Sequence, residues 1–138
     1  MKTLINKRIK AYTLTEILIV LAIIGILIVL AMPKLLPLIT KAKNLEAKLQ
    51  LQHAQQLEQA FFFEKSKYSA DLSEIGYLQE KLTTEAKDGK ANYRLTVPSA
   101  TNNAFMIRAT AVVDFDGDGT FNVWEIDQDK NLKEIIPD

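Results

Sequence analysis

The chain has 138 residues, with 17 basic and 17 acidic side chains and no cysteine. A chain of this length allows one domain with an extended element attached, and the lack of cysteine excludes disulfides and thiolate metal sites. The charges are unevenly placed, because residues 1–11 hold four basic side chains and no acid, whereas residues 114–138 are rich in acids. A basic start before an apolar segment is typical of a membrane topology, so we predict no nucleic-acid partner for the core function.

The first expected element is a membrane-spanning helix over residues 12–33. No residue from Ile17 to Met32 is charged or strongly polar. As a helix, residues 12–32 would be roughly 31 Å long at about 1.5 Å per residue, which is enough to cross a hydrocarbon core of about 30 Å. The basic residues before this helix would stay in the cytoplasm, and the remainder of the chain would lie outside it.

An amphipathic second half of the same helix is expected over residues 34–65, with bends at Pro33 and Pro37. Because the helical pattern continues past Pro33, and the sequence before it is a poor small-x-small cleavage site, a cleavable secretory signal is the weaker alternative. The phenylalanines at 61–63 are predicted to pack in the core. Four apolar residues share one helix face that we predict to pack against a partner surface: Leu38, Ala42, Leu45 and Leu49.

Residues 66–138 are predicted to form a globular head. A turn-rich connector over residues 66–90 has four apolar anchors, Tyr68, Leu72, Ile75 and Tyr77. Beyond it, NYRLTV, AFMIRATAVV and FNVWEI favour strands, and turn residues separate them. This pattern predicts an antiparallel sheet of three or four strands. A head of this size buries too small a core alone, so the amphipathic half of the helix should form its second layer, which gives an α+β fold.

Glu16 is an acid at the start of the apolar segment, and two interpretations of it remain open. In the first, Thr13-Leu14-Thr15-Glu16 is a capping box that satisfies backbone amides at the helix start. In the second, the carboxylate pairs with a positive charge on another molecule, because a carboxylate inside a bilayer costs on the order of 2.5 to 3.5 kcal/mol by insertion scales.

Residues 10–16 (KAYTLTE), followed by the apolar run, resemble the N-terminal signal of type IV pilins and type II secretion pseudopilins. In that family a short basic leader, here residues 1–11, is cut off before an aromatic residue whose new amine is then methylated. The resemblance implies cleavage between Ala11 and Tyr12, N-methylation of Tyr12, and a role for Glu16 in processing and assembly. The family usually has glycine before the cut, and Ala11 is small enough to replace it.

The resemblance implies a pilin-like fold and a filament subunit without enzymatic activity. Its partners would be copies of itself and related pilin-like subunits, a prepilin peptidase and methyltransferase, an inner-membrane assembly platform and membrane lipid. The subunit would be held in the bacterial inner membrane, with its head outside the cytoplasm, before it enters an extracellular or periplasmic filament. There Glu16 would neutralise the Tyr12 amine of a neighbour, which sets axial register more than it adds stability. The shared helix does not separate a pilus from a secretion pseudopilus, but the lack of cysteine and the DxDGDG loop favour a pseudopilin or a disulfide-free pilin.

Residues 114–127 (DFDGDGTFNVWEID) match the calcium-loop pattern D-x-D-x-D-G-x₅-E. Strand-like sequence flanks the loop, so a helix–loop–helix site is not expected. If the second flank is extended, Glu125 lies roughly 20 Å beyond Gly119 at about 3.3 Å per residue, too far to close the site. An acidic turn without metal is the alternative, although calcium is also a feature of the major pseudopilins that the chain resembles. The predicted Ca²⁺ ligands are Asp114, Asp116, Asp118 and Asn122.

Other candidate sites have plainer interpretations. His53 is the only histidine, and without a second histidine or a cysteine it is predicted to be a surface or packing residue. Trp124 is predicted to fill the core beneath the acidic loop. No nucleophile–base pair, phosphate-binding loop or pair of catalytic carboxylates stands out, so the sequence predicts no enzyme. The main alternative to a filament subunit is a membrane-tethered calcium- or ligand-binding module that does not polymerise.

Overall fold

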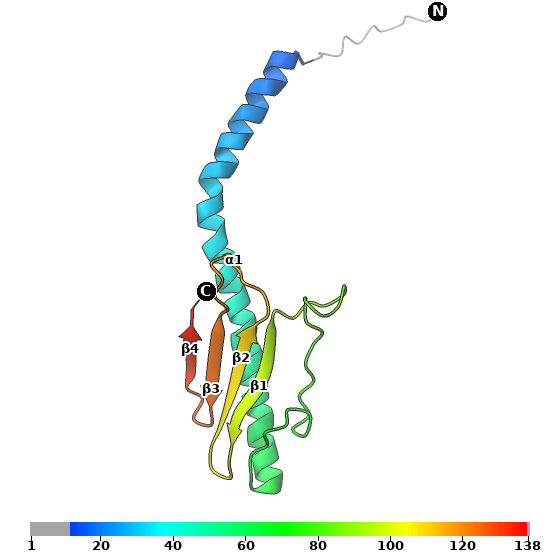
Figure 1. Cartoon of the computed structure of the whole chain (residues 1–138), viewed down its shortest axis with the longest axis vertical. Helices are drawn as coiled ribbons and strands as arrows, with labels where there is room; N and C mark the ends of the chain where they lie inside the picture. Colours follow the sequence, from blue (N-terminus) through cyan, green and yellow to red (C-terminus); the bar gives the residue numbers. More distant parts are fainter. Residues whose placement is uncertain (1–11, 138) are drawn as a thin grey trace, which may run out of the picture. The chain divides into compact units, whose positions relative to one another are not determined.

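The computed structural model describes residues 12–137. The chain divides into two compact units, Met1–Leu36 and Pro37–Asp138, and each is described here by itself. One helix and four strands follow one another along the chain (Figure 1). They are α1 (Leu14–Lys65), β1 (Tyr93–Ala100), β2 (Phe105–Ala111), β3 (Val123–Asp127) and β4 (Leu132–Ile136). The α+β fold with one long N-terminal helix is therefore confirmed, whereas the predicted leader at 1–11 lies outside the described residues.

The part of α1 in the first unit is apolar on every side. Apart from Lys34, the residues from Ile17 to Leu36 are apolar or small, and all of them are exposed in the single chain. A helix that is hydrophobic all round requires a membrane or a larger apolar core around it. By length and composition, α1 can cross a membrane.

The helix remains helical through Pro33 and Pro37 and ends at Lys65. Ser66 then adopts a φ of 56°, in the left-handed region where helices commonly end. Its amide donates to the carbonyl of Phe62 at 2.8 Å, which satisfies one of the carbonyls left free at a helix end. The chain can therefore turn back along α1 into the connector.

The sheet is a four-stranded antiparallel meander in the order β1-β2-β3-β4. Strand β2 has the clearest period of two, because every second residue from Phe105 to Ala111 is buried. The sequence analysis named three of these strands. It did not name β4, whose residues after Leu132 are exposed, because an edge strand lacks the alternation that identifies a strand.

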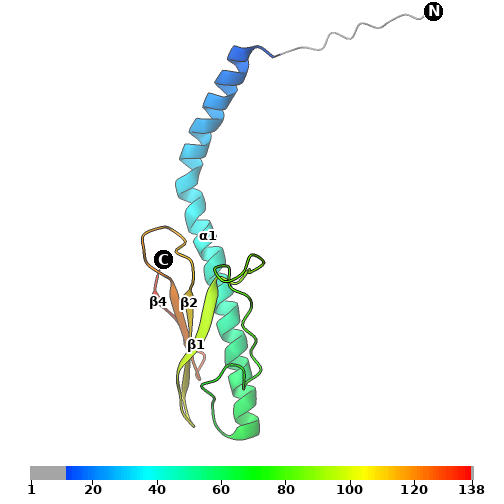
Figure 2. The ribbon, with the colours of Figure 1, turned by 45° about the vertical axis from the view of Figure 1, so that its right-hand side comes forward.

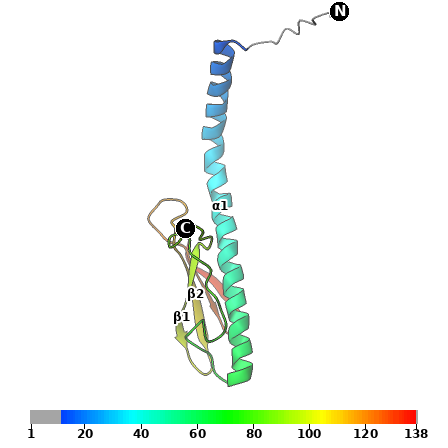
Figure 3. The same cartoon turned by 90° about the vertical axis from the view of Figure 1, so that its right-hand side faces the viewer.

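The helix supplies the second layer of the head, as predicted. Ala47, Leu51 and Ala54 have no exposed surface, and with Glu58 and Phe61 they repeat at the three- and four-residue spacing of one helix face. They pack against inward residues of the sheet, which include Tyr93, Leu95, Ile107, Ala109, Trp124 and Ile126. Figures 2 and 3 show the sheet lying along one side of the C-terminal part of α1.

The apolar face predicted to pack against a partner surface is not the face under the sheet, since Leu38, Leu45 and Leu49 are 60%, 56% and 58% exposed in the single chain. Its packing against a partner therefore stays a prediction. The small Ala47 and Ala54 allow the sheet a closer approach on the other face. The aromatic cluster also divides, because Phe61 is buried whereas Phe63 is 83% exposed.

The remaining packing predictions hold. The connector anchors Ile75 and Tyr77 are buried, Tyr68 and Leu72 pack against the core, and Trp124 is buried in it. His53 is exposed.

Candidate functional site

The helix start contains the capping box expected from its sequence. The backbone N–H and the hydroxyl of Thr13 both donate to Oε2 of Glu16 at 2.9 Å. In return, the backbone N–H of Glu16 donates to Oγ1 of Thr13 at 3.3 Å. This reciprocal pattern satisfies amides that a helix start leaves without partners.

The cap uses only one carboxylate oxygen. Among residues 12–137, Oε1 of Glu16 accepts no hydrogen bond. An open hollow of about 440 Å³ is lined by Tyr12, Glu16, Ile17, Ile19 and Val20. An acid in an apolar hollow suits a partner that brings both a positive charge and apolar surface. The capping and the pairing interpretations of Glu16 are therefore compatible.

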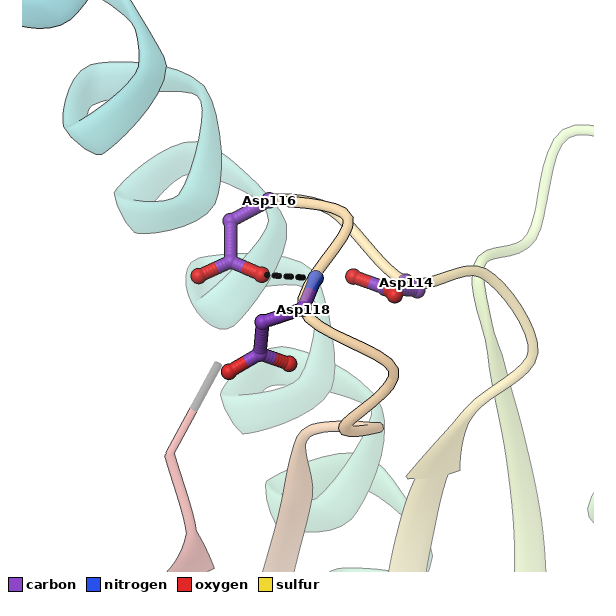
Figure 4. Close-up of side chains that lie close together, drawn as sticks. All are labelled: Asp114, Asp116 and Asp118. Carbon is purple, nitrogen blue, oxygen red and sulfur yellow. Dashed lines mark hydrogen bonds between the residues drawn. The ribbon is translucent and has the colours of Figure 1, made fainter.

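The acidic loop between β2 and β3 brings three carboxylates together (Figure 4). Asp114, Asp116 and Asp118 each place one oxygen within 4.8 Å of the others. Gly117 and Gly119 make the tight curl possible, because their φ angles of 83° and 90° lie in the left-handed region.

The loop's own amides hold these carboxylates in place. Asp114 accepts from Gly117 N at 2.6 Å and from Gly119 N at 2.7 Å. These hydrogen bonds, that from Gly119 first, lower the pKa of the Asp114 carboxyl. Asp116 accepts from Asp118 N at 3.0 Å. These hydrogen bonds thus favour the ionised form of Asp114 and hold the curled backbone of the loop in place.

The geometry of the three aspartates fits a calcium ion. Ca²⁺ takes six to eight oxygen ligands at about 2.3 to 2.6 Å, so two ligands of one ion lie at most roughly 5 Å apart. The three oxygens meet this limit. Other ligands would have to come from backbone carbonyls and water, which calcium sites commonly use.

Asn122, the fourth predicted ligand, is held in the core instead. It has no exposed surface, and its Oδ1 accepts from the Tyr93 hydroxyl at 2.8 Å. Its Nδ2 donates to Glu134 Oε1 at 2.8 Å and to Ile136 O at 3.0 Å. Two of these partners belong to β4, the strand that the sequence analysis did not name, so this role was not foreseeable.

Glu125 lies within β3, as the sequence analysis expected. It forms an ion pair with Arg108 of β2, with Arg108 Nε donating to Glu125 Oε1 at 2.7 Å. The carboxylate that would close an EF-hand is therefore engaged on the sheet.

Two further acids join α1 to the head, and the sequence analysis did not single them out. Glu46 accepts from the backbone N and from Nδ2 of Asn92, each at 2.7 Å. Glu58 has no exposed surface and accepts from Ser69 N at 3.1 Å. The signal for Glu58 was present, because it lies four residues after Ala54 on the buried stripe, where an acid requires a partner.

Burial raises the pKa of the Glu58 carboxyl. The nearby Glu74 carboxylate raises it further, whereas the hydrogen bond from Ser69 opposes both effects. The hydroxyl of Ser69 donates to Glu74, so one serine connects the two acids. Oε1 of Glu58 is buried without a hydrogen-bond partner among the described residues, which also favours the neutral form.

Comparison with known proteins gives three matches. Residues 6–32 match the model of the prokaryotic N-terminal methylation motif. Residues 37–121 match the model of the type IV minor pilin ComP, DNA uptake sequence receptor. The chain is also 33% identical over 123 residues to the type IV major pilin protein PilA of Myxococcus xanthus (strain DK1622). This match covers 79% of this chain and 56% of that protein. The chain thus spans little more than half the length of this relative.

Proposed function

The chain belongs to the type IV pilin family, and from this premise we propose that it is a structural subunit of a type IV pilus-like filament. The observation that carries this proposal is the apolar first part of α1, which has a single acid, Glu16, in its first turn. We propose that a prepilin peptidase removes residues 1–11, that Tyr12 is then N-methylated, and that the mature helix leaves the inner membrane through an assembly platform to join copies of itself.

Glu16 would act in this assembly through its uncapped oxygen. Oε2 keeps the helix start capped, while Oε1 accepts a hydrogen bond from the positively charged, methylated amine of Tyr12 in a neighbouring subunit. Each charge would be costly alone in an apolar filament core, and removing one member of a buried pair costs on the order of 3 to 5 kcal/mol. The pair therefore favours one axial register over others.

A pilus and a type II secretion pseudopilus would use the same helix. The matched family model and the matched relative are both described as type IV pilins, which favours the pilus. One of them is described as a DNA uptake receptor. Over residues 37–121 of this chain, acidic side chains slightly outnumber basic ones, which does not favour binding to a phosphate backbone.

We also propose that Asp114, Asp116 and Asp118 bind Ca²⁺ in the head. The gathering of their oxygens within 4.8 Å supports this site. A membrane-tethered calcium-binding module that never polymerises is the alternative function. It would persist in the membrane as a monomer, and Glu16 would not matter to it.

Processing and assembly are tested separately. Mass spectrometry of the protein from cells should show a chain that begins at methylated Tyr12. Ala11→Trp should block this cleavage, whereas Ala11→Gly, the family's usual residue, should be cleaved. A wild-type chain that retains Met1 would contradict the proposed processing.

Assembly is tested with Glu16→Gln. Glutamine can still serve in a capping box, so helix formation, membrane insertion and cleavage should persist, while the neighbour's amine loses its counter-charge. Imaging and shearing of cells should show filaments for wild type and few or none for the variant, with cleaved monomers retained in the membrane. If the Glu16→Gln variant assembled as well as wild type, the Glu16 carboxylate would serve only to cap the helix and would have no role in assembly.

A further inference from the structure

The first part of the connector is attached to α1 by a buried serine. The backbone N–H of Ser69 donates to Oε2 of Glu58 on α1 at 3.1 Å, and its hydroxyl donates to the carboxylate of Glu74. Both Ser69 and Glu58 are buried. One serine therefore ties the connector to the helix and places two carboxylates beside each other.

An aromatic contact lies next to this attachment. The ring of Tyr68 stacks on that of Phe62 in α1, with 4.7 Å between their centroids, and lies 4.7 Å from the ring of Phe105 in β2. Aromatic pairs at such distances add to the stability gained from apolar burial. Phe63, beside Phe62, is 83% exposed. Removal of Tyr68 would thus uncover two more phenylalanine rings near an exposed one.

Glu58 is the least favourable part of this attachment when it is ionised. Its side chain has no exposed surface, and its Oε1 has no hydrogen-bond partner among the described residues. In that part of the chain, Glu74 is the only charged group whose field acts on the Glu58 carboxyl, and it carries the same sign. A buried carboxylate without a counter-charge is costly, whereas the neutral acid avoids this cost.

The segment that covers Glu58 can move as one piece. Three backbone hydrogen bonds close residues 71–77 on themselves, from Glu74 N to Asp71 O, from Gly76 N to Ser73 O and from Tyr77 N to Leu72 O. Ser66 at one end and Gly76 at the other have φ angles of 56° and 82°, where the chain changes direction. Such a self-contained surface segment can open while the core elements stay folded.

From this geometry we propose that residues 66–77 form a pH-sensitive flap, which is docked on α1 while Glu58 is neutral and lifts from it when Glu58 ionises. Lifting would let water reach the carboxylate and would uncover Phe62 and Phe105, while the sheet stays folded. The flap does not depend on the proposed filament function, because all of its parts lie in the head.

The direction of the pH dependence follows from the closed state. Burial, and then the Glu74 carboxylate, raise the pKa of the Glu58 carboxyl above its ordinary value of 4.5. The open flap therefore releases a proton that the closed flap holds, so its opening constant rises with pH, by at most about tenfold per pH unit. The rise begins near pH 4.5 and ends at the pKa of the closed state.

Two other groups in the flap titrate outside this range. Hydrogen bonds from Ser73 lower the pKa of the Asp71 carboxyl from 3.8. Burial, chiefly, raises the pKa of the Tyr77 hydroxyl to about 12. Neither group changes its charge between pH 4.5 and 8, so neither produces the expected response.

Hydrogen exchange of the full chain in detergent micelles tests the flap. Exchange at pH 4 to 8, corrected for intrinsic rates, should show amides 66–77 losing protection by up to about tenfold per pH unit above 4.5, while those of β2 do not follow. Glu58→Gln should remove this response, because the amide stays neutral and its oxygen can still accept from Ser69. Glu64→Gln, at an exposed position on the last turns of α1, is the matched control and should keep it.

Glu74→Gln provides a second test, which remains decisive if Glu58→Gln does not fold. It removes the like charge, so the loss of protection should end at a lower pH than in wild type. The flap would be overturned by protection of residues 66–77 that does not change with pH, or by an equal loss in β2, which would indicate global unfolding. A wild-type response in Glu58→Gln or in Glu74→Gln would overturn it as well.

Discussion

At the scale of single residues, Glu58 couples the stability of the head to pH. Its pKa is raised above the ordinary value of 4.5, chiefly by burial. The folded state therefore holds a proton that the unfolded chain has already lost as pH rises through that value. The contribution of Glu58 to the free energy of unfolding is thus most favourable below the unfolded pKa and is lost as pH rises through the folded pKa.

We expect Glu58→Gln to remove this dependence, because the amide is neutral at every pH. The difference in free energy of unfolding between variant and wild type should grow in favour of the variant from below pH 4.5 to neutral pH. Denaturant titrations of residues 37–138 at several pH values would measure it. Glu64→Gln, at an exposed position, is the control, and a constant difference for Glu58→Gln would contradict the account.

Asp116 reports on calcium at the acidic loop. If the three aspartates bind Ca²⁺, calcium should raise the free energy of unfolding of residues 37–138 by RT ln(1 + [L]/Kd), which is about 2.7 kcal/mol at 100 times Kd. The melting temperature should rise accordingly. Asp116→Ala should abolish this shift. Glu125→Ala should retain it, because Glu125 pairs with Arg108 instead. Identical melting in calcium and in chelator would leave an acidic turn without metal.

At the scale of elements, Glu46 fastens α1 to the start of β1. Both of its oxygens accept hydrogen bonds from Asn92, a residue that is only 5% exposed. Glu46→Ala would leave two donors of Asn92 without this partner. Hydrogen bonds to charged groups contribute about 1.5 to 3 kcal/mol, and an unsatisfied buried group adds its own cost.

We therefore expect Glu46→Ala to lower the free energy of unfolding of residues 37–138 by about 2 kcal/mol. Urea denaturation followed by circular dichroism would measure this. Glu80→Ala, at an exposed connector position without an ion pair among the described residues, should change it little. Equal effects of the two substitutions would rule out a special role of Glu46.

At the scale of the whole molecule, the two compact units have different environments. The core of the head draws on residues from Ala47 to Ile126, all within Pro37–Asp138. Residues 37–138 should therefore fold and remain soluble without detergent, whereas the full chain should need lipid or detergent. Sedimentation and circular dichroism of both would test this, and an aggregated or unfolded fragment would show that the head depends on the first unit.

Features of the fold that depend on neighbouring residues could be predicted from the sequence, whereas features that depend on residues distant in sequence could not. The apolar segment, the capping box at Thr13 and Glu16 and the curl around Gly117 and Gly119 follow from neighbouring residues. The strand β4 and the role of Asn122 did not, because an edge strand has weak alternation and a buried amide takes partners distant in sequence. Calcium binding and processing remain predictions.

The sequence by itself determined that α1 is long, that its first part requires an apolar environment, and that an acid stands at its start, because these properties depend on residue type and helical spacing. It also showed one apolar stripe on the second part of α1, through Leu38, Ala42, Leu45 and Leu49. Only the tertiary structure revealed that the sheet covers a different stripe. The sheet lies against Ala47 and Ala54, where small side chains permit close packing and Glu46 and Glu58 find partners, and this leaves the leucine stripe exposed. That choice depends on the fit of two surfaces distant in sequence, which no local pattern encodes.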